Sequence, residues 1–360
     1  MDKVNEGEGR SFDLWIERLV DLSRVWKLGE QVREWGLGPY VYASIFVLSN
    51  LVVYSLFVGR EILSLEVLLV FLVGWMGIMF AVWASVRGKD KYLSINREIG
   101  LPLFSKPFFP KDRFPGDKIK DLFFPRLQFS ALIFFLGLFV FYLFWAGEVE
   151  RAVLSGGFSS LGVGLFFYFS WIFAYIPIFA GFGALTVGIP LWFPYKIKNY
   201  LEDLDFSDPE RNAGLGKAGD LILSYCQYYY AGLAIFTLFL FLFGVDMSSW
   251  VFYLLLSGWV FGLFLFFYPS YQLHIFMRGE KEKKLREVGK EIRQFGEEPG
   301  GRLEVNGKDL EEKVDYIFLF LEHEQVYNTS EYPFDERIIQ QFVSAALAPV
   351  SLQLLFFFVF

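Results

Sequence analysis

The sequence predicts an all-α, polytopic integral membrane protein with six to seven transmembrane helices and a cytoplasmic helical hairpin. Apolar residues make up 54% of its 360 residues, aromatic residues 21% and charged residues only 20%, whereas a soluble domain averages about 25% charge. Apolar stretches of about 20 residues, the length that crosses a bilayer, recur along the chain. Lys and Arg are concentrated in alternate connections between these stretches. The composition excludes a disordered chain, a nucleic-acid-binding protein and a small secreted module.

The first segment, residues 1–38, is polar and mixed in charge, and it lacks the apolar core of a cleavable signal peptide. The first membrane helix is therefore expected to direct insertion. Within this segment, residues 12–35 carry apolar side chains at roughly helical spacing. Their tryptophans suit a cytoplasmic helix that lies in the membrane interface. An ordinary packing helix explains the same pattern equally well.

Residues 39–274 are predicted to form a domain of six transmembrane helices. The spans must be helical because lipid offers the backbone no hydrogen-bond partner. In chain order they cover residues 40–58, 62–86, 127–145, 158–192, 221–243 and 250–273.

Residues 337–360 are predicted to form a seventh transmembrane helix or a re-entrant helix. The segment is apolar overall, but Gln340, Gln341, Pro349 and Gln353 interrupt it. Both alternatives stay open at this stage, because a proline and three amides weaken a transmembrane pattern without excluding it.

The distribution of basic residues predicts the orientation. Ten Lys and Arg lie in 87–126, six in the first 38 residues, four in 196–220 and ten in 275–336. The intervening connections carry only Arg60 and Arg151. Because cytoplasmic loops are enriched in Lys and Arg, we expect a multi-pass protein of the cell membrane with its N-terminus in the cytoplasm. The inner loops would be 87–126 and 195–220.

The longest polar segment, residues 275–336, is predicted to form the cytoplasmic helical hairpin. Two apolar seams at helical spacing lie on either side of a Gly- and Pro-rich connection. The first seam is Leu285, Val288, Ile292 and Phe295, and the second is Leu310, Val314, Ile317 and Leu321.

The fourth span has the most unusual backbone composition, because prolines and glycines recur in its second half. Proline removes a backbone hydrogen bond and kinks a helix. Broken helices line the solute paths of many transporters, so one hypothesis is a discontinuous helix beside a pore. The alternative is a kinked, tilted helix whose glycines allow close packing. The candidate residues are Pro177, Gly181, Gly183 and Gly188.

Polar side chains also gather near the expected inner ends of the fifth and sixth spans. Ser224, Gln227 and Tyr228 share one helix face by their spacing, and Gln272 and His274 lie at the end of the sixth span. These residues are candidates for lining a polar vestibule. An aromatic belt at the membrane interface explains the tyrosines alone.

No catalytic, cofactor-binding or metal-binding residues are predicted. Ionisable residues are nearly absent from the middle of the spans, which argues against a carboxylate proton relay. The single cysteine, Cys226, cannot form an intramolecular disulfide. The two histidines, His274 and His323, have no metal-site spacing around them. An enzyme is therefore the least favoured class.

Three features follow one another near the end of the chain. A helix leaves through Pro269 and His274 in the order P-S-Y-Q-L-H, a Lys- and Arg-rich helix follows, and Tyr332–Asp335 (Y-P-F-D) leads into the last apolar segment. This order resembles multi-spanning archaeal and bacterial membrane proteins of uncharacterised function. The resemblance covers roughly residues 269–351 and implies a prokaryotic membrane protein, but no activity.

The leading functional expectation is a channel-like or transporter-like protein that passes ions or small solutes near its fourth to sixth helices. The alternative is a membrane-anchored sensory or scaffold protein that acts through its cytoplasmic loop and hairpin. The expected partners are the lipid bilayer, a further copy of the chain in a homo-oligomer, and a protein on the cytoplasmic side. No nucleic acid is expected.

Overall fold

The computed structural model describes residues 14, 16–17, 19–20, 37–58, 65–98, 133, 136, 169–201, 204–208, 212–242, 249–296, 310–334 and 336–359. Three predicted features lie almost wholly outside the described residues: the third span at 127–145, the inner loop beyond residue 98, and the helix within residues 1–38.

The described part is built from helices and contains no β-strand. The two π-helical segments carry the labels η6 and η7. The elements are α4 (Gly38–Val58), α5 (Leu65–Glu98), η6 (Trp171–Tyr175), α9 (Ile176–Gly183), η7 (Ala184–Gly188), α10 (Ile189–Tyr200), α11 (Gly216–Leu242), α12 (Ser249–Gly296), α13 (Leu310–Asn328) and α14 (Glu336–Val359).

Five helical stretches of the described chain are long and apolar enough to cross a membrane. They are Leu68–Asn96, Ile172–Asn199, Gly216–Leu242, Val251–Gln294 and Glu336–Leu355. The predicted helical membrane class is thus confirmed at this level. The apolar stretch of α4, Gly38–Val53, is shorter.

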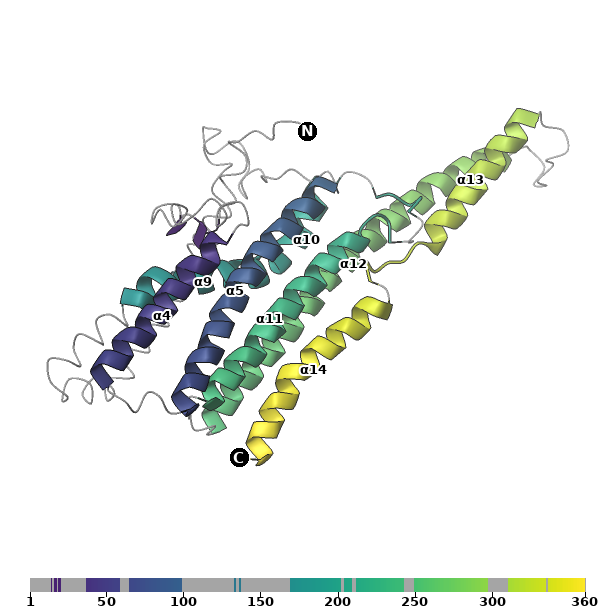
Figure 1. Cartoon of the computed structure of the whole chain (residues 1–360). Helices are drawn as coiled ribbons and strands as arrows, with labels where there is room; N and C mark the ends of the chain where they lie inside the picture. The colour runs from purple at the N-terminus through teal and green to yellow at the C-terminus, as the bar shows by residue number, and fades with distance from the viewer. Residues whose placement is uncertain are drawn as a thin grey trace.

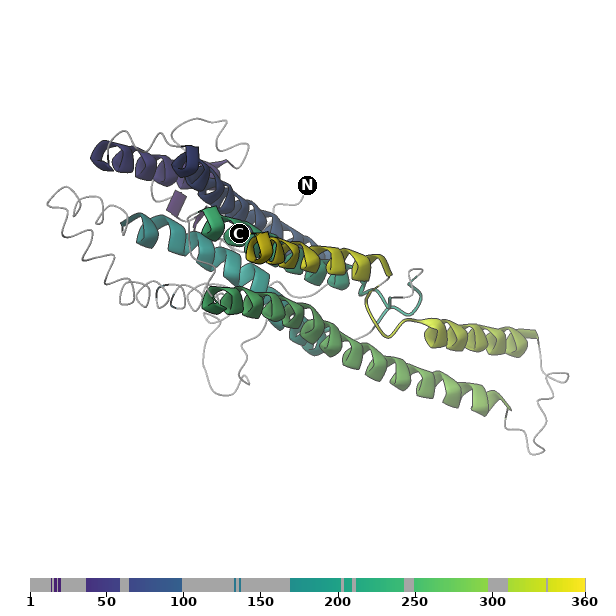
Figure 2. The ribbon, with the colours of Figure 1, turned by 90° about the horizontal axis from the view of Figure 1, so that it is seen from below.

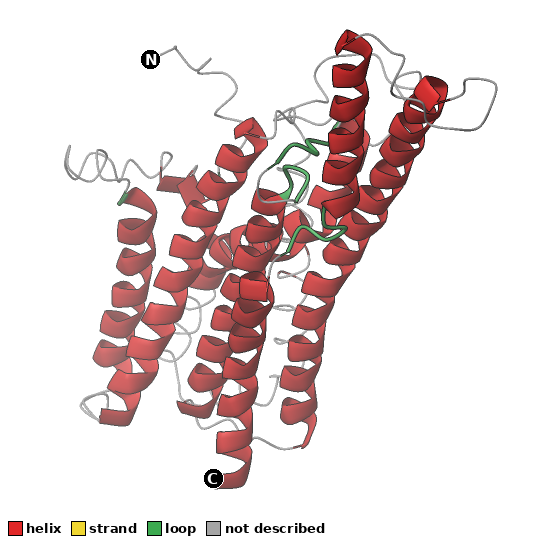
Figure 3. Cartoon of the chain, turned by 90° about the vertical axis from the view of Figure 1, so that its right-hand side faces the viewer, coloured by secondary structure: helices red, strands yellow, loops and turns green. Residues whose placement is uncertain are grey.

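Helix α11 is central in the bundle (Figure 1). Figure 3 shows the described elements as helices joined by loops. Helix α11 packs against α5 on one side and against α12 and α14 on the other, while α4 packs against α5. The core around α11 includes Tyr225, Cys226 and Tyr230, each no more than 1% exposed. The last helix therefore belongs to the bundle, and Trp259 of α12 fixes it by donating its indole N–H to the Ala346 carbonyl at 2.7 Å.

The outer surface of the bundle is apolar. Large hydrophobic side chains such as Leu48, Met76, Phe267 and Leu355 are 51–59% exposed. Water would penalise so much exposed apolar surface, whereas lipid tails would not. The surface therefore suits a lipid environment.

Close packing inside the bundle depends on glycines that face tyrosines. A Cβ on Gly262 of α12 would lie 2.6 Å from the Tyr230 ring, and one on Gly88 of α5 would lie 2.9 Å from the Tyr225 ring. Small residues let membrane helices approach closely. The α11 tyrosines thus use the space that glycine leaves on both neighbouring helices.

Three helices extend further than the sequence predicted. Helix α5 continues to Glu98 rather than ending at 86, and α10 continues to Tyr200 rather than ending at 192. Part of each expected inner loop, 87–126 and 195–220, is therefore helical. The predicted ends lie near the first charges and near Pro194. A helix can, however, extend beyond its apolar stretch. Proline is also tolerated in a membrane helix where neighbouring groups satisfy the backbone.

The sixth span and the first arm of the hairpin form one helix, which is the third extension. Helix α12 runs unbroken from Ser249 to Gly296, with Pro269 inside it. Its second half packs against α13, and the pair projects beyond the bundle (Figures 1 and 2). Helix α14 is likewise continuous through Pro349.

Described residues of the N-terminal segment pack on protein. Leu14, Ile16 and Val20 are each at most 2% exposed. Glu17 forms an ion pair with Lys89 of α5 at 2.6 Å. Packing on protein explains the burial of these residues better than a position in the membrane interface does.

Candidate functional site

The fourth span contains two wide turns instead of a break. Each π segment directly precedes a proline at the second position of the next α-helix: η6 precedes Pro177, and η7 precedes Pro190. Proline has no N–H, and its ring clashes with the carbonyl four residues earlier. A π turn relieves that clash by widening the backbone. The connecting residues keep right-handed helical backbone angles, so the unwound gap that a discontinuous helix needs is not found within 169–200.

The predicted proline and glycine candidates lie along this modified helix. Pro177 and Gly181 are buried in α9, whereas Gly183 and Gly188 are partly exposed at the ends of α9 and η7. A Cβ on Gly181 would lie 3.8 Å from Leu14. Gly181 thus faces the described N-terminal residues, which favours a packing role for this position.

The most unusual charged group is Lys196 of α10, a side chain that is 0% exposed. Its ammonium nitrogen donates to the Tyr92 hydroxyl at 3.2 Å. It also lies 5.4 Å from the ring centres of Tyr92 and Trp192. Within the described residues, no carboxylate forms an ion pair with it. A buried charge is costly without a partner, so Lys196 marks a candidate site.

A second buried polar group lies one turn beyond Tyr92 on α5. Asn96 is 0% exposed and adjoins the Tyr92 side chain. Among the residues that the structure describes, neither its amide nitrogen nor its amide oxygen has a hydrogen-bond partner at normal distance and angle. Most buried polar atoms in proteins are hydrogen-bonded, so this amide is an exception that needs an explanation.

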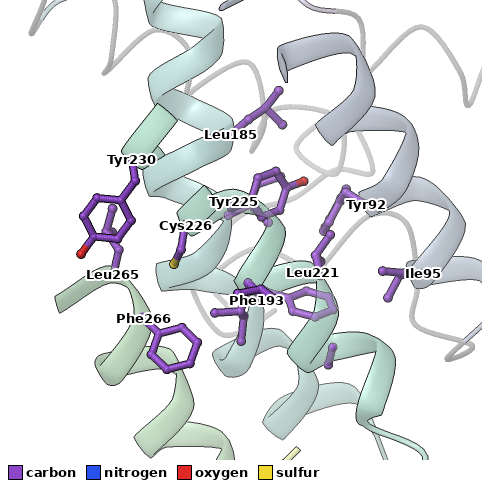
Figure 4. Close-up of a cluster of buried hydrophobic side chains, with 14 of the residues drawn as sticks. Tyr92, Ile95, Leu185, Phe193, Leu221, Tyr225, Cys226, Tyr230, Leu265 and Phe266 are labelled. Atoms are coloured by element: carbon purple, nitrogen blue, oxygen red, sulfur yellow. The ribbon is translucent and has the colours of Figure 1, made fainter. Parts of the chain in front are cut away.

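Aromatic side chains form the walls of this region. The Tyr92 ring meets the Phe193 ring edge to face, with centroids 6.0 Å apart. Figure 4 shows Tyr92 of α5, Phe193 of α10 and Tyr225 of α11 gathered in the core. Tyr225 donates its hydroxyl to the Gly88 carbonyl at 2.8 Å. The site thus lies where α5, α10 and α11 meet.

The predicted polar group on α11 lies against α5. Ser224 donates to the Asp220 carbonyl at 2.7 Å and accepts from Lys91 at 2.5 Å. Tyr228 meets the Trp83 ring edge to face at 5.4 Å, and Gln227 is half-buried. Two of the three predicted residues therefore join α11 to α5.

The predicted polar group on α12 lies elsewhere. The His274 ring stacks on Tyr332 with centroids 4.1 Å apart, and its Nδ1 lies 3.1 Å from the Glu331 carbonyl. Gln272 is half-buried on the same helix. None of the contacts described for these residues joins the α12 group to the α11 group.

Within the described chain, no three His, Cys, Asp or Glu side chains gather closely enough to hold a metal ion. His274 is engaged by Tyr332, and His323 lies on α13. Cys226 is buried in the core.

Sequence reasoning missed Lys196, Tyr92 and Asn96. All three fell in segments expected to be inner loops. The signal that could have found them was helical spacing: Tyr92 and Asn96 are four residues apart, as are Trp192 and Lys196. That spacing becomes informative only if both helices continue past their charged or proline-containing ends.

The chain matches no protein-family model, no curated protein and no solved structure.

Proposed function

We propose that the protein is a channel-like or transporter-like membrane protein that passes ions or small solutes beside the segment 169–200, α11 and α12. The observation that carries the proposal is the fourth span itself. It combines two π segments with a buried lysine toward its end. Ionisable residues inside spans mark solute and ion paths by default, and π turns often occur at functional sites.

The topology belongs to the same proposal. Six or seven spans would cross the cell membrane, with the N-terminus and the inner connections in the cytoplasm. A cysteine-labelling experiment tests the orientation, with the wild-type protein as the control for labelling of Cys226. Cys226 is buried and lies in the core, whereas the Lys283 side chain is 60% exposed. With Lys283→Cys, a membrane-impermeant maleimide should label inverted vesicles and leave intact cells unlabelled. Labelling of intact cells would overturn the orientation.

Reconstitution tests transport. Purified protein in liposomes should carry at least one member of a panel of inorganic cations, inorganic anions and small neutral solutes. Pro190→Ala should lower that flux, because restoring an N–H lets the η7 turn close to α geometry. Pro349→Ala in α14 is the matched control, since Pro349 lies inside a helix without a π segment, and it should leave flux unchanged. Absence of flux for the whole panel, with protein that remains folded, would refute the proposal.

The second candidate is a membrane-anchored scaffold that self-associates through its hairpin. One observation favours it: Ile317, Phe318 and Phe320 of α13 are 53–65% exposed. Phe318→Ser should then reduce the oligomer size measured by light scattering in detergent. Wild-type protein that is monomeric at every concentration would exclude this candidate.

A further inference from the structure

A protonated Lys196 would carry a charge without a matching anion in the described structure, and a bound anion would favour this protonated form. Its ammonium group has three N–H donors, and the Tyr92 hydroxyl accepts one of them. The nitrogen also lies over the rings of Tyr92 and Trp192, whose faces attract a cation without supplying an anionic acceptor. The carboxyl end of α10 offers a partial negative charge a few residues on. The net charge around the protonated Lys196 nitrogen is therefore positive.

The Asn96 amide adds further hydrogen-bonding capacity to the same place. It presents two N–H donors and one carbonyl oxygen, and within the described part of the chain both polar atoms are buried without a hydrogen bond of normal geometry. Asn96 is not exposed to solvent at all. Burying an unsatisfied amide costs free energy that an apolar side chain of similar size would not cost. A bound group that accepts from the amide would remove this cost.

Tyr92 joins the two groups. Its hydroxyl accepts from Lys196, and its side chain adjoins Asn96 one turn along α5. The cluster therefore presents a cation and an amide from two different helices, with aromatic side chains around them. The surplus of N–H donors over acceptors excludes a metal cation as the ligand.

We propose that Lys196, Asn96 and Tyr92 form a binding site for a small monovalent anion, either a halide or a short carboxylate. The anion would accept from Lys196 and from the Asn96 amide, and it would neutralise the buried charge. A small anion is expected because Lys196, Asn96 and Tyr92 are all fully buried and the Phe193 ring packs against Tyr92. The inference deepens the proposed function by naming the class of solute, but binding is measured without any transport.

Ligand-dependent unfolding tests the site on the full-length protein in non-ionic detergent. Sodium gluconate, whose anion is too large for the site, keeps the ionic strength constant while chloride, nitrate, formate or acetate replaces it. A bound ligand raises the unfolding temperature in a saturable manner. We expect saturable stabilisation by at least one of the four small anions. No saturable shift with any of them would overturn the proposal, and a site that holds only water would give that result.

Three variants assign the effect to the site. Lys196→Met and Asn96→Leu replace the polar groups with apolar side chains of similar size, and each should weaken anion binding about tenfold or more. Lys217→Met is the matched control, because Lys217 pairs with Glu98 at the surface, and it should bind as wild type. Equal anion effects in all variants would show general screening and would refute the site.

Two features keep the test decisive. Asn96→Leu removes only the contact with the Tyr92 side chain and keeps a buried side chain of similar size, so this variant should fold even if Lys196→Met does not. Binding and flux can also fail separately. Saturable binding without flux would refute transport and leave the anion site standing, whereas flux of cations without anion binding would refute only the site.

Discussion

The bundle and the projecting hairpin use charge in opposite ways. In the bundle, Lys196 is fully buried and has a tyrosine hydroxyl and aromatic rings as its described partners. In the hairpin, Lys284 of α12 pairs with Glu322 of α13 at 2.8 Å, with both side chains about 40% exposed. Exposed ion pairs contribute little to stability, whereas a buried unpaired charge is costly. The costly arrangement is the one that suggests a function.

The same contrast holds for packing. Inside the bundle, glycines face tyrosine rings, whereas a Cβ added to Gly279 or Gly289 in the second half of α12 would meet nothing within 4 Å. One helix therefore passes from a crowded environment to an open one. Substitutions along α12 can measure that difference directly.

The largest expected effect comes from Gly262→Ala compared with Gly279→Ala. A Cβ at 262 would collide with the buried Tyr230 ring, and overpacking of this kind costs about 1–3 kcal/mol. At 279 the same change should stabilise the helix by about 0.5–1 kcal/mol through helix propensity. Thermal unfolding in detergent measures both. Equal effects at the two positions would contradict the contrast in packing.

The second largest loss of stability is expected from Trp259→Phe. It removes the indole N–H that bonds to the Ala346 carbonyl and leaves a small cavity between α12 and α14. The expected loss is about 1–2 kcal/mol. Increased proteolysis within α14 at low protease concentration would show that this contact fixes the last helix to the bundle. Unchanged proteolysis and stability would show that α14 is held by its aromatic contacts alone, such as the Phe266–Phe342 stack.

Tyr225→Phe isolates one hydrogen bond at the junction of α5 and α11. The Tyr225 hydroxyl donates to the Gly88 carbonyl inside the core, so its removal should cost about 1 kcal/mol. Tyr253→Phe provides the control, because the Tyr253 side chain is 65% exposed and its change should be neutral. Chemical denaturation of the two variants side by side makes the comparison.

The smallest effect is expected in the hairpin. Lys284→Gln breaks the pair with Glu322 and should change stability by about 0.5 kcal/mol or less. The difference from wild type should shrink further at high salt, because screening weakens exposed pairs. A loss above about 2 kcal/mol would show that the hairpin pair contributes as much stability as the bundle contacts. That result would contradict the difference between the two regions.

Much of the fold could be predicted from the sequence. Apolar stretches of sufficient length fix the helical membrane class, because lipid leaves the backbone no alternative. The apolar seams around Val288 and Val314 predict the two arms of the hairpin. Helix ends were harder to place, because charges and prolines mark the end of an apolar stretch and not the end of a helix. That difference explains why α5 and α10 extend beyond their predicted limits.

The candidate site was decided by the tertiary structure. In the sequence, Lys196 is one of four basic residues in a connection, and Asn96 is an ordinary polar residue among charges. Only the packing of α10 against the other helices buries Lys196 beside Tyr92, and only the tertiary structure leaves the Asn96 amide without a hydrogen-bond partner among the described residues. Local spacing can place residues on one face of a helix, but their burial depends on which other helix covers that face. The position of the covering helix is set by contacts between residues far apart in the chain.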